Sequence, residues 1–239
     1  MFRFFRSKKQ RSTASPASIA QHRADPHFPF LISFPRTGSH WLRMLLERYT
    51  DQPLLVRSFY PHRRQDYLLL HTHDKQLTEQ RQNVLYLYRH PLNVIYSQLK
   101  FYNQPVHDEN LIVFWAQQYS AHLIHWCFRE KITTHKTLIT YEGLQRNMEM
   151  EFRKVTTHLN LSFDAERLAQ VQAEISKAQV AQQTKHDQRV MNLTDTYEAQ
   201  RRAFHARHQA LIVEVFEQTA QWSLGTTDSL WALFDENLP

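Results

Sequence analysis

The sequence has few of the residues that cross-link a chain or carry it across a membrane. Its 239 residues include one cysteine, Cys127, so an intrachain disulfide cannot form and a cysteine-rich zinc site is excluded. No apolar run of about eighteen residues occurs, so no membrane span is expected. There are three glycines, and each is therefore a candidate for a tight turn or a close backbone approach. A single cysteine fits a reducing compartment, and we expect a cytoplasmic protein.

The net charge of +6 is concentrated near the amino terminus. Residues 1–29 hold six basic side chains and one acidic side chain, so they carry five of the six net charges. The remaining residues are nearly neutral, and no nucleic-acid partner is expected for them. Their apolar content is enough for a packed core, since 42% of the whole sequence is hydrophobic.

Residues 1–27 form a basic tail that lacks the apolar core of a secretion signal. We predict that this tail is disordered and solvated. The alternative is weak contact with an anionic membrane surface, into which Phe2, Phe4 and Phe5 would insert while the cations are attracted to the lipid headgroups. In that case the protein would lie peripherally at the inner membrane face.

Short apolar runs alternate with longer amphipathic stretches along residues 28–239, which we expect to form one domain. This alternation predicts an α/β fold of three layers, with a central, mostly parallel sheet flanked by helices. The expected strands are residues 30–34, 67–70, 84–88 and 137–140, with a short one near 54–56. The expected helices are residues 39–49, 92–101, 110–128, 144–159, 165–175 and 197–220. The polar stretch at about 176–196 is typical of a lid.

Residues 30–49 combine a strand, a tight turn and the start of a helix. The run from Phe30 to Phe34 suits a buried parallel strand, and Pro35 ends it. The turn that follows is rich in hydroxyl groups and carries one cation, and Gly38 would let the backbone pass close to an oxyanion. The first N–H groups of a helix lack partners and bind anions. Taken alone, the residues also fit a plain strand-to-helix turn capped by Ser39, and G-x-x-x-x-G-K-[ST] is absent.

Two histidines follow the apolar run at residues 67–70. Ligands bind beyond the carboxyl ends of parallel strands, and a neutral histidine is a natural base near pH 7. His71 and His73 are therefore candidates for that role. The chain has 15 histidines, so this spacing could also arise by chance. It could be half of a metal site too, although no carboxylate or cysteine cluster completes one in the sequence.

A second candidate anion site follows the strand predicted at residues 84–88. Arg89 stands at its carboxyl end, and Pro91 suits the first turn of the next helix. Ser97 lies eight residues after Arg89, so the helix can return a hydroxyl group towards an anion held by the arginine. Arginine binds phosphate oxygens with two N–H groups at once. Taken alone, these residues also fit a turn and a packed polar side chain.

Four strings, in this order along the chain, resemble one family. Residues 35–42, P-R-T-G-S-H-W-L, resemble the 5′-phosphosulfate loop of sulfotransferases that use 3′-phosphoadenosine 5′-phosphosulfate (PAPS), typically P-K/R-S/T-G-T/S/N-T-W-L. Residues 72–73 match the end of the family's K-T-H. Residues 89–97, R-H-P-L-N-V-I-Y-S, resemble its 3′-phosphate motif R-(D/N/H)-P-x-D/N-x-x-x-S. Residues 141–144, Y-E-G-L, are similar to its Y-E-D-L, with glycine in place of aspartate.

The resemblance implies a P-loop-like sulfotransferase architecture and a role for each matching residue. The expected reaction moves a sulfuryl group from PAPS to a hydroxyl or amine and leaves adenosine 3′,5′-bisphosphate (PAP), without a metal. Arg36 would stabilise charge on the leaving 5′-phosphate, and His73 would take the proton of the acceptor. Arg89 and Ser97 would contact the 3′-phosphate. The remaining nucleotide contacts are expected from Thr37, Gly38, Ser39, His40, Trp41 and Tyr141, with Trp41 stacked on the adenine and Tyr141 close to it.

Two family features are absent. His71 stands where the family has a lysine, and it can replace that charge only if it is protonated. The C-terminal R-K-G-x-x-G-D-W segment is missing, and Lys185 or Arg189 of the predicted lid could supply its cation instead. These departures leave a non-catalytic nucleotide-binding member of the same fold as an alternative. A nucleotide-dependent kinase is the other alternative, although it needs a loop lysine and a magnesium-binding acid.

The expected acceptor is a small molecule, a glycan or a lipid. Aromatic residues such as Phe59, Tyr60, Tyr102 and Trp115 could line either an apolar pocket for it or the core.

Overall fold

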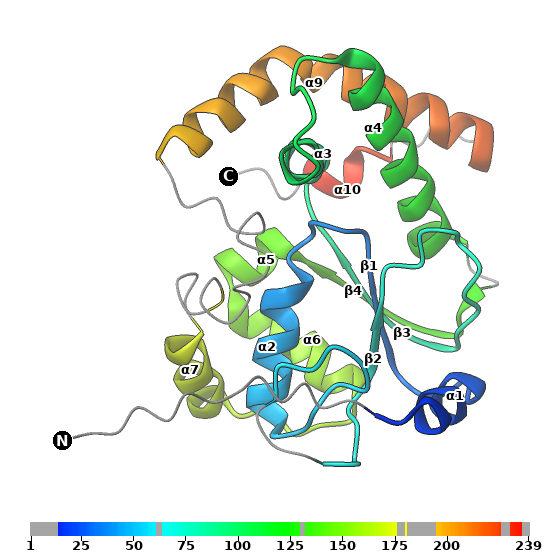
Figure 1. Cartoon of the computed structure of the whole chain (residues 1–239), viewed down its shortest axis with the longest axis vertical. Coiled ribbons are helices and arrows are strands. Elements are labelled where there is room, and N and C mark those ends of the chain that lie inside the picture. The colour runs from blue at the N-terminus through cyan, green and yellow to red at the C-terminus, as the bar shows by residue number, and fades with distance from the viewer. Residues whose placement is uncertain are drawn as a thin grey trace.

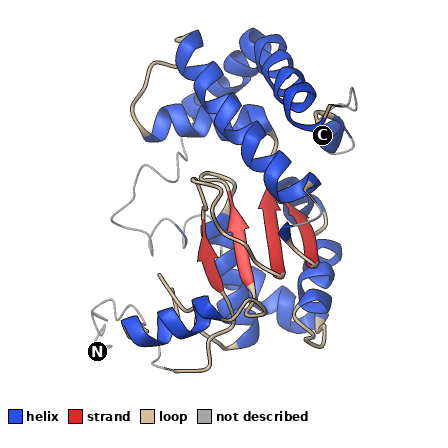
Figure 2. Cartoon of the chain, turned by 90° about the vertical axis from the view of Figure 1, so that its right-hand side faces the viewer, coloured by secondary structure: helices blue, strands red, loops and turns tan. Residues whose placement is uncertain are grey.

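Four parallel strands form the centre of the molecule (Figure 1). The computed structural model describes residues 14–60, 64–129, 132–175, 180, 195–225 and 230–235. The strands are β1 (Phe30–Ser33), β2 (Leu70–Thr72), β3 (Asn83–Tyr88) and β4 (His135–Thr140), in the spatial order β2-β1-β3-β4. In the register, Ile32 of β1 lies between Thr72 of β2 and Tyr86 of β3. All four strands therefore end at the same edge of the sheet (Figure 2).

Helices cover both faces of the sheet, which gives three layers (Figures 1 and 2). One layer contains α2 (Ser39–Thr50), α5 (Tyr141–Arg146), α6 (Met148–His158) and α7 (Ala165–Glu174). The other contains α3 (Pro91–Phe101), α4 (Glu109–Leu123), the π-helical turn η1 (Ile124–Phe128), α9 (Asp195–Leu224) and α10 (Ala232–Asp235). The long helix α9 packs along α3 and α4. The prediction of an α/β fold with a parallel sheet between helical layers is confirmed.

The alternation of side chains along β1 separates two hydrophobic cores. Phe30 and Ile32 belong to the core beneath α3, α4 and α9, whereas Leu31 belongs to the core beneath α2, α6 and α7. All three side chains are fully buried. Burying each stabilises the fold by about 1.5–3 kcal/mol relative to leaving it in water. A strand buried on both faces is apolar at every position, which is why β1 is recognisable in the sequence.

Capping residues set where several helices begin. Asp108 accepts hydrogen bonds from the N–H groups of Asn110 and Leu111 at the start of α4. Thr140 accepts one from Gly143, so β4 passes directly into α5. Pro91 occupies the first turn of α3, where a missing N–H group costs nothing. These local signals fix the helix starts nearest the carboxyl edge of the sheet.

Several predicted elements differ from the observed ones. The short strand near 54–56 is wrong: Leu55 donates one backbone hydrogen bond to Leu69, and no strand forms there. The second strand is β2 at Leu70–Thr72, later than predicted, because its pairing to β1 is set by Phe30 opposite Leu70. The helix predicted at 144–159 is two helices, since Asn147 caps a new start.

Part of the predicted tail is helical. Residues 1–13 lie outside the described part of the chain, but α1 (Pro16–Ala24) begins at Ser15, whose side chain accepts a hydrogen bond from the Ser18 N–H group. Arg81 ties this helix to the start of β3 by donating to the Arg23 carbonyl. The folded region therefore includes residues before 28. Of the predicted lid, residues 176–179 and 181–194 lie outside the described residues. No helix in the described part of the chain combines the length and apolar character needed to cross a membrane.

Candidate functional site

The turn after β1 requires glycine at position 38. Gly38 has φ +94°, in the left-handed region, and it is the residue that precedes α2. A Cβ atom at this position would lie 2.3 Å from Cδ2 of Tyr141. Thr37 is fully buried and donates its hydroxyl to the Phe34 carbonyl at 2.8 Å, so this hydroxyl braces the turn. The predicted loop is therefore held from within by Thr37 and from outside by Tyr141.

Arg36 leaves the same turn towards α3. Its backbone is also left-handed, with φ 74°. Its Nε donates a hydrogen bond to Oγ of Ser97 at 2.9 Å, and its guanidinium lies over the ring of Phe101 at 4.9 Å from the centroid. The first predicted anion site and the serine of the second are therefore in direct contact.

Arg89 lies on the other side of this turn. Its Nη1 donates to the Arg36 carbonyl at 3.3 Å, and its guanidinium lies 4.2 Å from the centroid of the Tyr141 ring. Its Nε is buried and has no hydrogen-bond partner among the described residues, with Glu142 Oε1 4.0 Å away. A buried cationic donor of this kind favours an anionic partner. The two predicted anion sites thus form one continuous surface.

Tyr119 positions the backbone of Arg89. Its hydroxyl accepts a hydrogen bond from the Arg89 N–H group at 3.0 Å and donates one to the Arg89 carbonyl at 2.7 Å. Tyr119 is fully buried, and burial raises the pKa of its hydroxyl well above its ordinary value. A neutral phenol is required for this double role, because the phenolate could not donate.

Tyr141 contacts several of the residues that the sequence predicts to bind the nucleotide. In addition to Gly38 and Arg89, it contacts Trp41 edge to face, with ring centroids 5.8 Å apart. Trp41 and Tyr141 are both partly exposed. The structure therefore brings Arg36, Gly38, Trp41, Arg89, Ser97 and Tyr141 into one group. Ser39 is buried at the first position of α2.

His73 lies just beyond the end of β2 and contacts β1. Its Nδ1 is 2.7 Å from the Ser33 carbonyl, which can only accept a hydrogen bond, so Nδ1 carries the proton. This tautomer leaves Nε2 as the acceptor of the ring. Burial, with the charges of Arg43, Lys75 and Arg57, lowers the pKa of His73 to about 4. The neutral ring at pH 7 has the protonation state of a base.

A second histidine supports His73 from α4. Nε2 of His122 donates to the His73 carbonyl at 2.8 Å, and its Nδ1 accepts from the Tyr86 hydroxyl at 2.7 Å. Burial lowers the pKa of His122 to about 3, so this ring is neutral as well. This support has no local signal in the sequence, since it joins β3 and α4 to the end of β2.

His71 is neutral in this environment. It lies in β2, is 6% exposed, and its Nε2 is 3.1 Å from Oγ of Ser33. Burial, followed by the charge of Arg43, lowers its pKa well below the ordinary value. The condition for His71 to replace the family's lysine is therefore not met.

Arg43 is the buried cation nearest these histidines. It lies on α2, one turn after His40, and its charge lowers the pKa of His40, His71 and His73. Its Nη2 donates to the Arg57 carbonyl, and its guanidinium lies 4.8 Å from the centroid of the Phe59 ring. Burial lowers its pKa to about 10, so Arg43 stays charged at neutral pH.

His40 lies between the anion loop and the histidine pair. Burial, then the charges of Arg43, Arg36 and His73, lowers its pKa to about 3. Its ring contacts Phe59, with centroids 5.6 Å apart. A neutral His40 can still donate one hydrogen bond to an anion, but it adds no charge.

Arg201 of α9 was missed by the sequence analysis. Its Nη1 donates to Oδ1 of Asn93 at 2.6 Å, and Asn93 donates to Glu142 Oε1 at 3.3 Å. Burial, followed by the charges of His205, Arg89 and Arg201, lowers the pKa of His90 to about 4. Arg201 therefore brings a further cation to the Arg89 side of the site. Lys185 and Arg189, which were expected to do so, lie outside the described residues.

Glycine at position 143, in place of the aspartate of Y-E-D-L, has a steric explanation. A Cβ atom there would lie 2.7 Å from Cδ of Glu151. Glu151 is 2% exposed, and its Oε2 accepts the Thr140 N–H group at 3.1 Å. An aspartate at 143 would displace this carboxylate from the end of β4.

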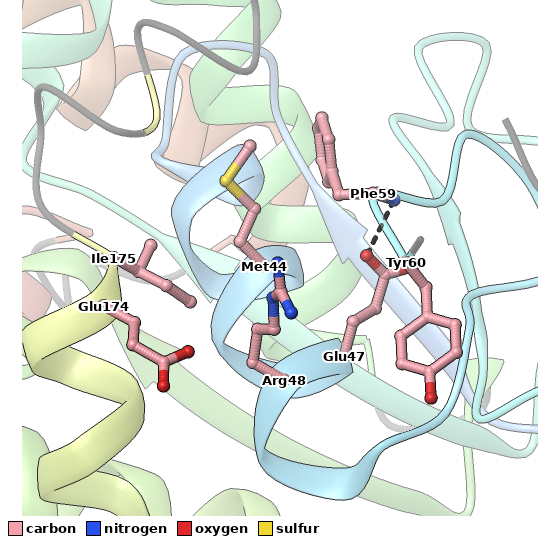
Figure 3. A pocket seen from close by; sticks show the side chains of 7 residues that line it. All are labelled: Met44, Glu47, Arg48, Phe59, Tyr60, Glu174 and Ile175. Carbon is pink, nitrogen blue, oxygen red and sulfur yellow. Dashed lines mark hydrogen bonds between the residues drawn. The ribbon is translucent and has the colours of Figure 1, made fainter. Parts of the chain in front are cut away.

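A small pocket of about 30 Å³ lies elsewhere, between α2 and α7 (Figure 3). Its lining contains none of the predicted nucleotide or catalytic residues, but it includes Phe59 and Tyr60, two of the aromatic residues considered for the acceptor. The buried Glu47 shapes it, since its Oε2 accepts the Phe59 N–H group at 2.7 Å. Burial raises the pKa of Glu47 despite this bond and despite Arg43. The lining residues are Met44, Glu47, Arg48, Phe59, Tyr60, Glu174 and Ile175.

Among the described residues, no group of three or more histidine, cysteine, aspartate or glutamate side chains is placed to hold a metal ion. No family model and no curated protein sequence matches the chain.

Two solved structures are similar in fold. Mouse sulfotransferase SULT7A1 in complex with PAP has a TM-score of 0.48 and 17% identity, over 70% of this chain and 72% of that one. The sulfotransferase domain from the curacin biosynthetic pathway has a TM-score of 0.41 and 16% identity, over 62% of this chain and 78% of that one. Both similarities are distant, and neither assigns chemistry to this chain.

Proposed function

We propose that the protein is a sulfotransferase that uses PAPS and transfers its sulfuryl group to a hydroxyl or amine. One observation carries the proposal: the Arg36 turn, Ser97 and Arg89 are in direct contact at the carboxyl edge of the sheet. They come from two separate stretches of the chain, the turn after β1 and the β3–α3 unit. A ligand with anionic groups at two points would match these two neighbouring arginines.

The residues present fit such a nucleotide. Arg36 and the start of α2 would hold the 5′-phosphosulfate, where backbone N–H groups and the helix dipole favour negative charge. Arg89, whose Nε has no hydrogen-bond partner in the described part of the chain, would hold the 3′-phosphate with Ser97. Trp41 and Tyr141 offer aromatic surface for the adenine. Bound PAPS supplies an activated sulfuryl group.

His73 would act as the base. The hydroxyl proton of the acceptor moves to Nε2, while Nδ1–H remains bonded to the Ser33 carbonyl, which fixes the ring. Arg36 meets the negative charge that develops on the 5′-phosphate oxygen as the bond to sulfur breaks. Arginine cannot give up its proton at working pH, so its role is electrostatic. Buried Arg43 supplies the positive field that neutral His71 does not.

Nucleotide binding is the first test. PAP at saturating concentration should raise the melting temperature by several degrees, because a ligand that binds only the folded state stabilises it by mass action. ATP with magnesium should have a much smaller effect. Equal or reversed shifts would count against the assignment and favour a nucleotide-dependent kinase.

Turnover is the second test. ³⁵S-labelled PAPS incubated with fractionated extract of the producing cells should label an acceptor. His73→Ala should abolish labelling while PAP binding is kept, and His27→Ala, which changes an exposed histidine, should leave both unchanged. Equal labelling by the His73→Ala protein would remove His73 from the mechanism. PAP binding without labelling of any fraction would favour the non-catalytic alternative.

A further inference from the structure

Four aromatic side chains form a platform at the end of α3 and the start of α4: Phe101, Tyr102, Phe114 and Trp115. The rings of Tyr102 and Trp115 are stacked, 8° from parallel, with centroids 5.4 Å apart. Phe101 contacts Tyr102 edge to face and Phe114 contacts Trp115 in the same way, each at 5.1 Å. Tyr102 is 45% exposed and Phe114 is 48% exposed. Exposed aromatic clusters of this kind mark binding surfaces more often than scattered single residues do.

Trp115 holds Tyr102 in place. Its Nε1 donates to Oε1 of Gln104 at 2.8 Å, which fixes the indole under the tyrosine ring. One face of Tyr102 packs on this indole, and the residue remains 45% exposed. The phenol is thus a flat, pre-positioned surface that loses little side-chain entropy when a ligand stacks on it.

The platform adjoins the proposed active site at two points. Phe101 lies beneath the guanidinium of Arg36, 4.9 Å from its carbon. At the other side, Nζ of Lys75 is 3.5 Å from the Tyr102 hydroxyl. Lys75 follows His73 by two residues, and its charge contributes to the lowered pKa of His73. Phe101 and Lys75 therefore connect the platform to the loop arginine and to the segment that carries the proposed base.

We propose that Tyr102, backed by Trp115, is the acceptor subsite and that it binds a sugar ring, so that the acceptor is a carbohydrate. The inference rests on the proposed function. A pyranose has a face of C–H groups, which packs on an aromatic plane, and a rim of hydroxyl groups, which needs polar partners. Lys75 and Gln104 lie at the edges of the platform and provide such partners.

The open form of the platform favours a sugar over the other acceptor classes. A simple phenol gains most from a pocket that encloses its whole ring. An alkyl chain cannot form hydrogen bonds, so it would gain nothing from an ammonium and an amide group beside it. A sugar that remains partly hydrated needs one covered face and a polar rim, and Tyr102 with its neighbours provides both.

Binding can be measured apart from turnover. The PAP-saturated protein would be applied to an array of neutral, amino-sugar and uronic-acid oligosaccharides, and hits would be confirmed by saturation-transfer NMR. We expect contact at the C–H protons of one ring. Tyr102→Ala should weaken binding at least tenfold, and Tyr102→Phe, which keeps the ring, should change it less than threefold. Trp222→Ala removes an aromatic ring that is 79% exposed and lies outside the platform, so it should have no effect.

The outcomes separate this inference from the function on which it rests. PAP binding without any bound oligosaccharide would overturn the sugar subsite and leave the nucleotide assignment standing. Tyr102-dependent binding of p-nitrophenol in place of oligosaccharides would also overturn it. Oligosaccharide binding that survives Tyr102→Ala would place the sugar elsewhere. Oligosaccharide binding by a protein that does not bind PAP would refute both the sulfotransferase and the role of this surface as its acceptor subsite.

Discussion

Arg36 and Ser97 are joined by a hydrogen bond between the two predicted anion sites, from Nε to Oγ at 2.9 Å. The arginine belongs to the turn after β1 and the serine to the middle of α3, and the chain between them contains β2 and β3. A bound nucleotide must therefore compete with this bond or share its donors. The contact holds the arginine in place before any ligand arrives, which reduces the entropy lost on binding.

Ser97→Ala tests this arrangement. We expect the affinity for PAP to fall by about 10- to 100-fold, because a hydrogen bond to a charged group contributes about 1.5–3 kcal/mol. The melting temperature without ligand should also fall by a few degrees, because the substitution removes the hydrogen bond that Arg36 Nε donates to this buried hydroxyl. Isothermal titration calorimetry measures the affinity. Ser162→Ala, at an exposed loop position, is the matched control, and equal affinities for the two variants would remove Ser97 from the site.

Arg201→Gln tests the cation that α9 brings to the site. If Arg201 acts on the 3′-phosphate, the affinity for PAP should fall about tenfold or more, whereas that for adenosine 5′-monophosphate, which lacks this phosphate, should be almost unchanged. The neighbouring Arg202 is exposed on the same helix, so Arg202→Gln makes the same change of charge outside the site. A parallel loss for both nucleotides would show that Arg201 acts only on the fold, through Asn93 and Glu198.

The sheet and the turn after β1 were predictable because their signals are local. β1 is apolar at each position but one, Pro35 follows it, and Gly38 is one of three glycines in the chain. A strand buried on both faces and a turn in the left-handed region each leave such a mark on the sequence. The choice of Arg89 and Ser97 likewise depended on spacing within one strand-helix unit.

The rest of the site depends on packing between distant segments, for which the sequence has no local signal. The Tyr119 hydroxyl binds both the N–H and the carbonyl of Arg89 because α4 lies over the end of β3. Arg201 belongs to a helix about a hundred residues later and binds Asn93. The neutral state of His71 has the same origin: burial in this edge strand, followed by the charge of Arg43 on α2, lowers its pKa. A lysine at that position would need a partner that these neighbours do not supply.

Gly38→Ala should destabilise the protein through two separable effects. A left-handed backbone costs a residue with a side chain roughly 1–2 kcal/mol, and the new methyl group would also collide with the Tyr141 ring, which lies 2.3 Å from the ideal Cβ position. Urea unfolding should therefore show a loss of about 2–4 kcal/mol. In a Tyr141→Ala background the same substitution should cost only the backbone part. If Gly38→Ala costs the same stability with and without the Tyr141 side chain, the ring does not collide with the new methyl group.

Mild acid should destabilise the fold. Burial lowers the pKa of His90 to about 4, of His122 to about 3 and of His158 to about 4, whereas each titrates near 6.5 when unfolded. The unfolded chain therefore binds more protons, and stability present above pH 6.5 is lost as the pH falls towards 4. At pH 5 each of these histidines lowers the free energy of unfolding by at most about 2 kcal/mol. Buried Glu47, whose pKa is raised, acts in the opposite direction.

Urea unfolding at pH 7.5 and pH 5.0 measures the loss of stability, which His122→Gln should reduce. Equal stabilities at the two pH values would mean that these rings are not held neutral.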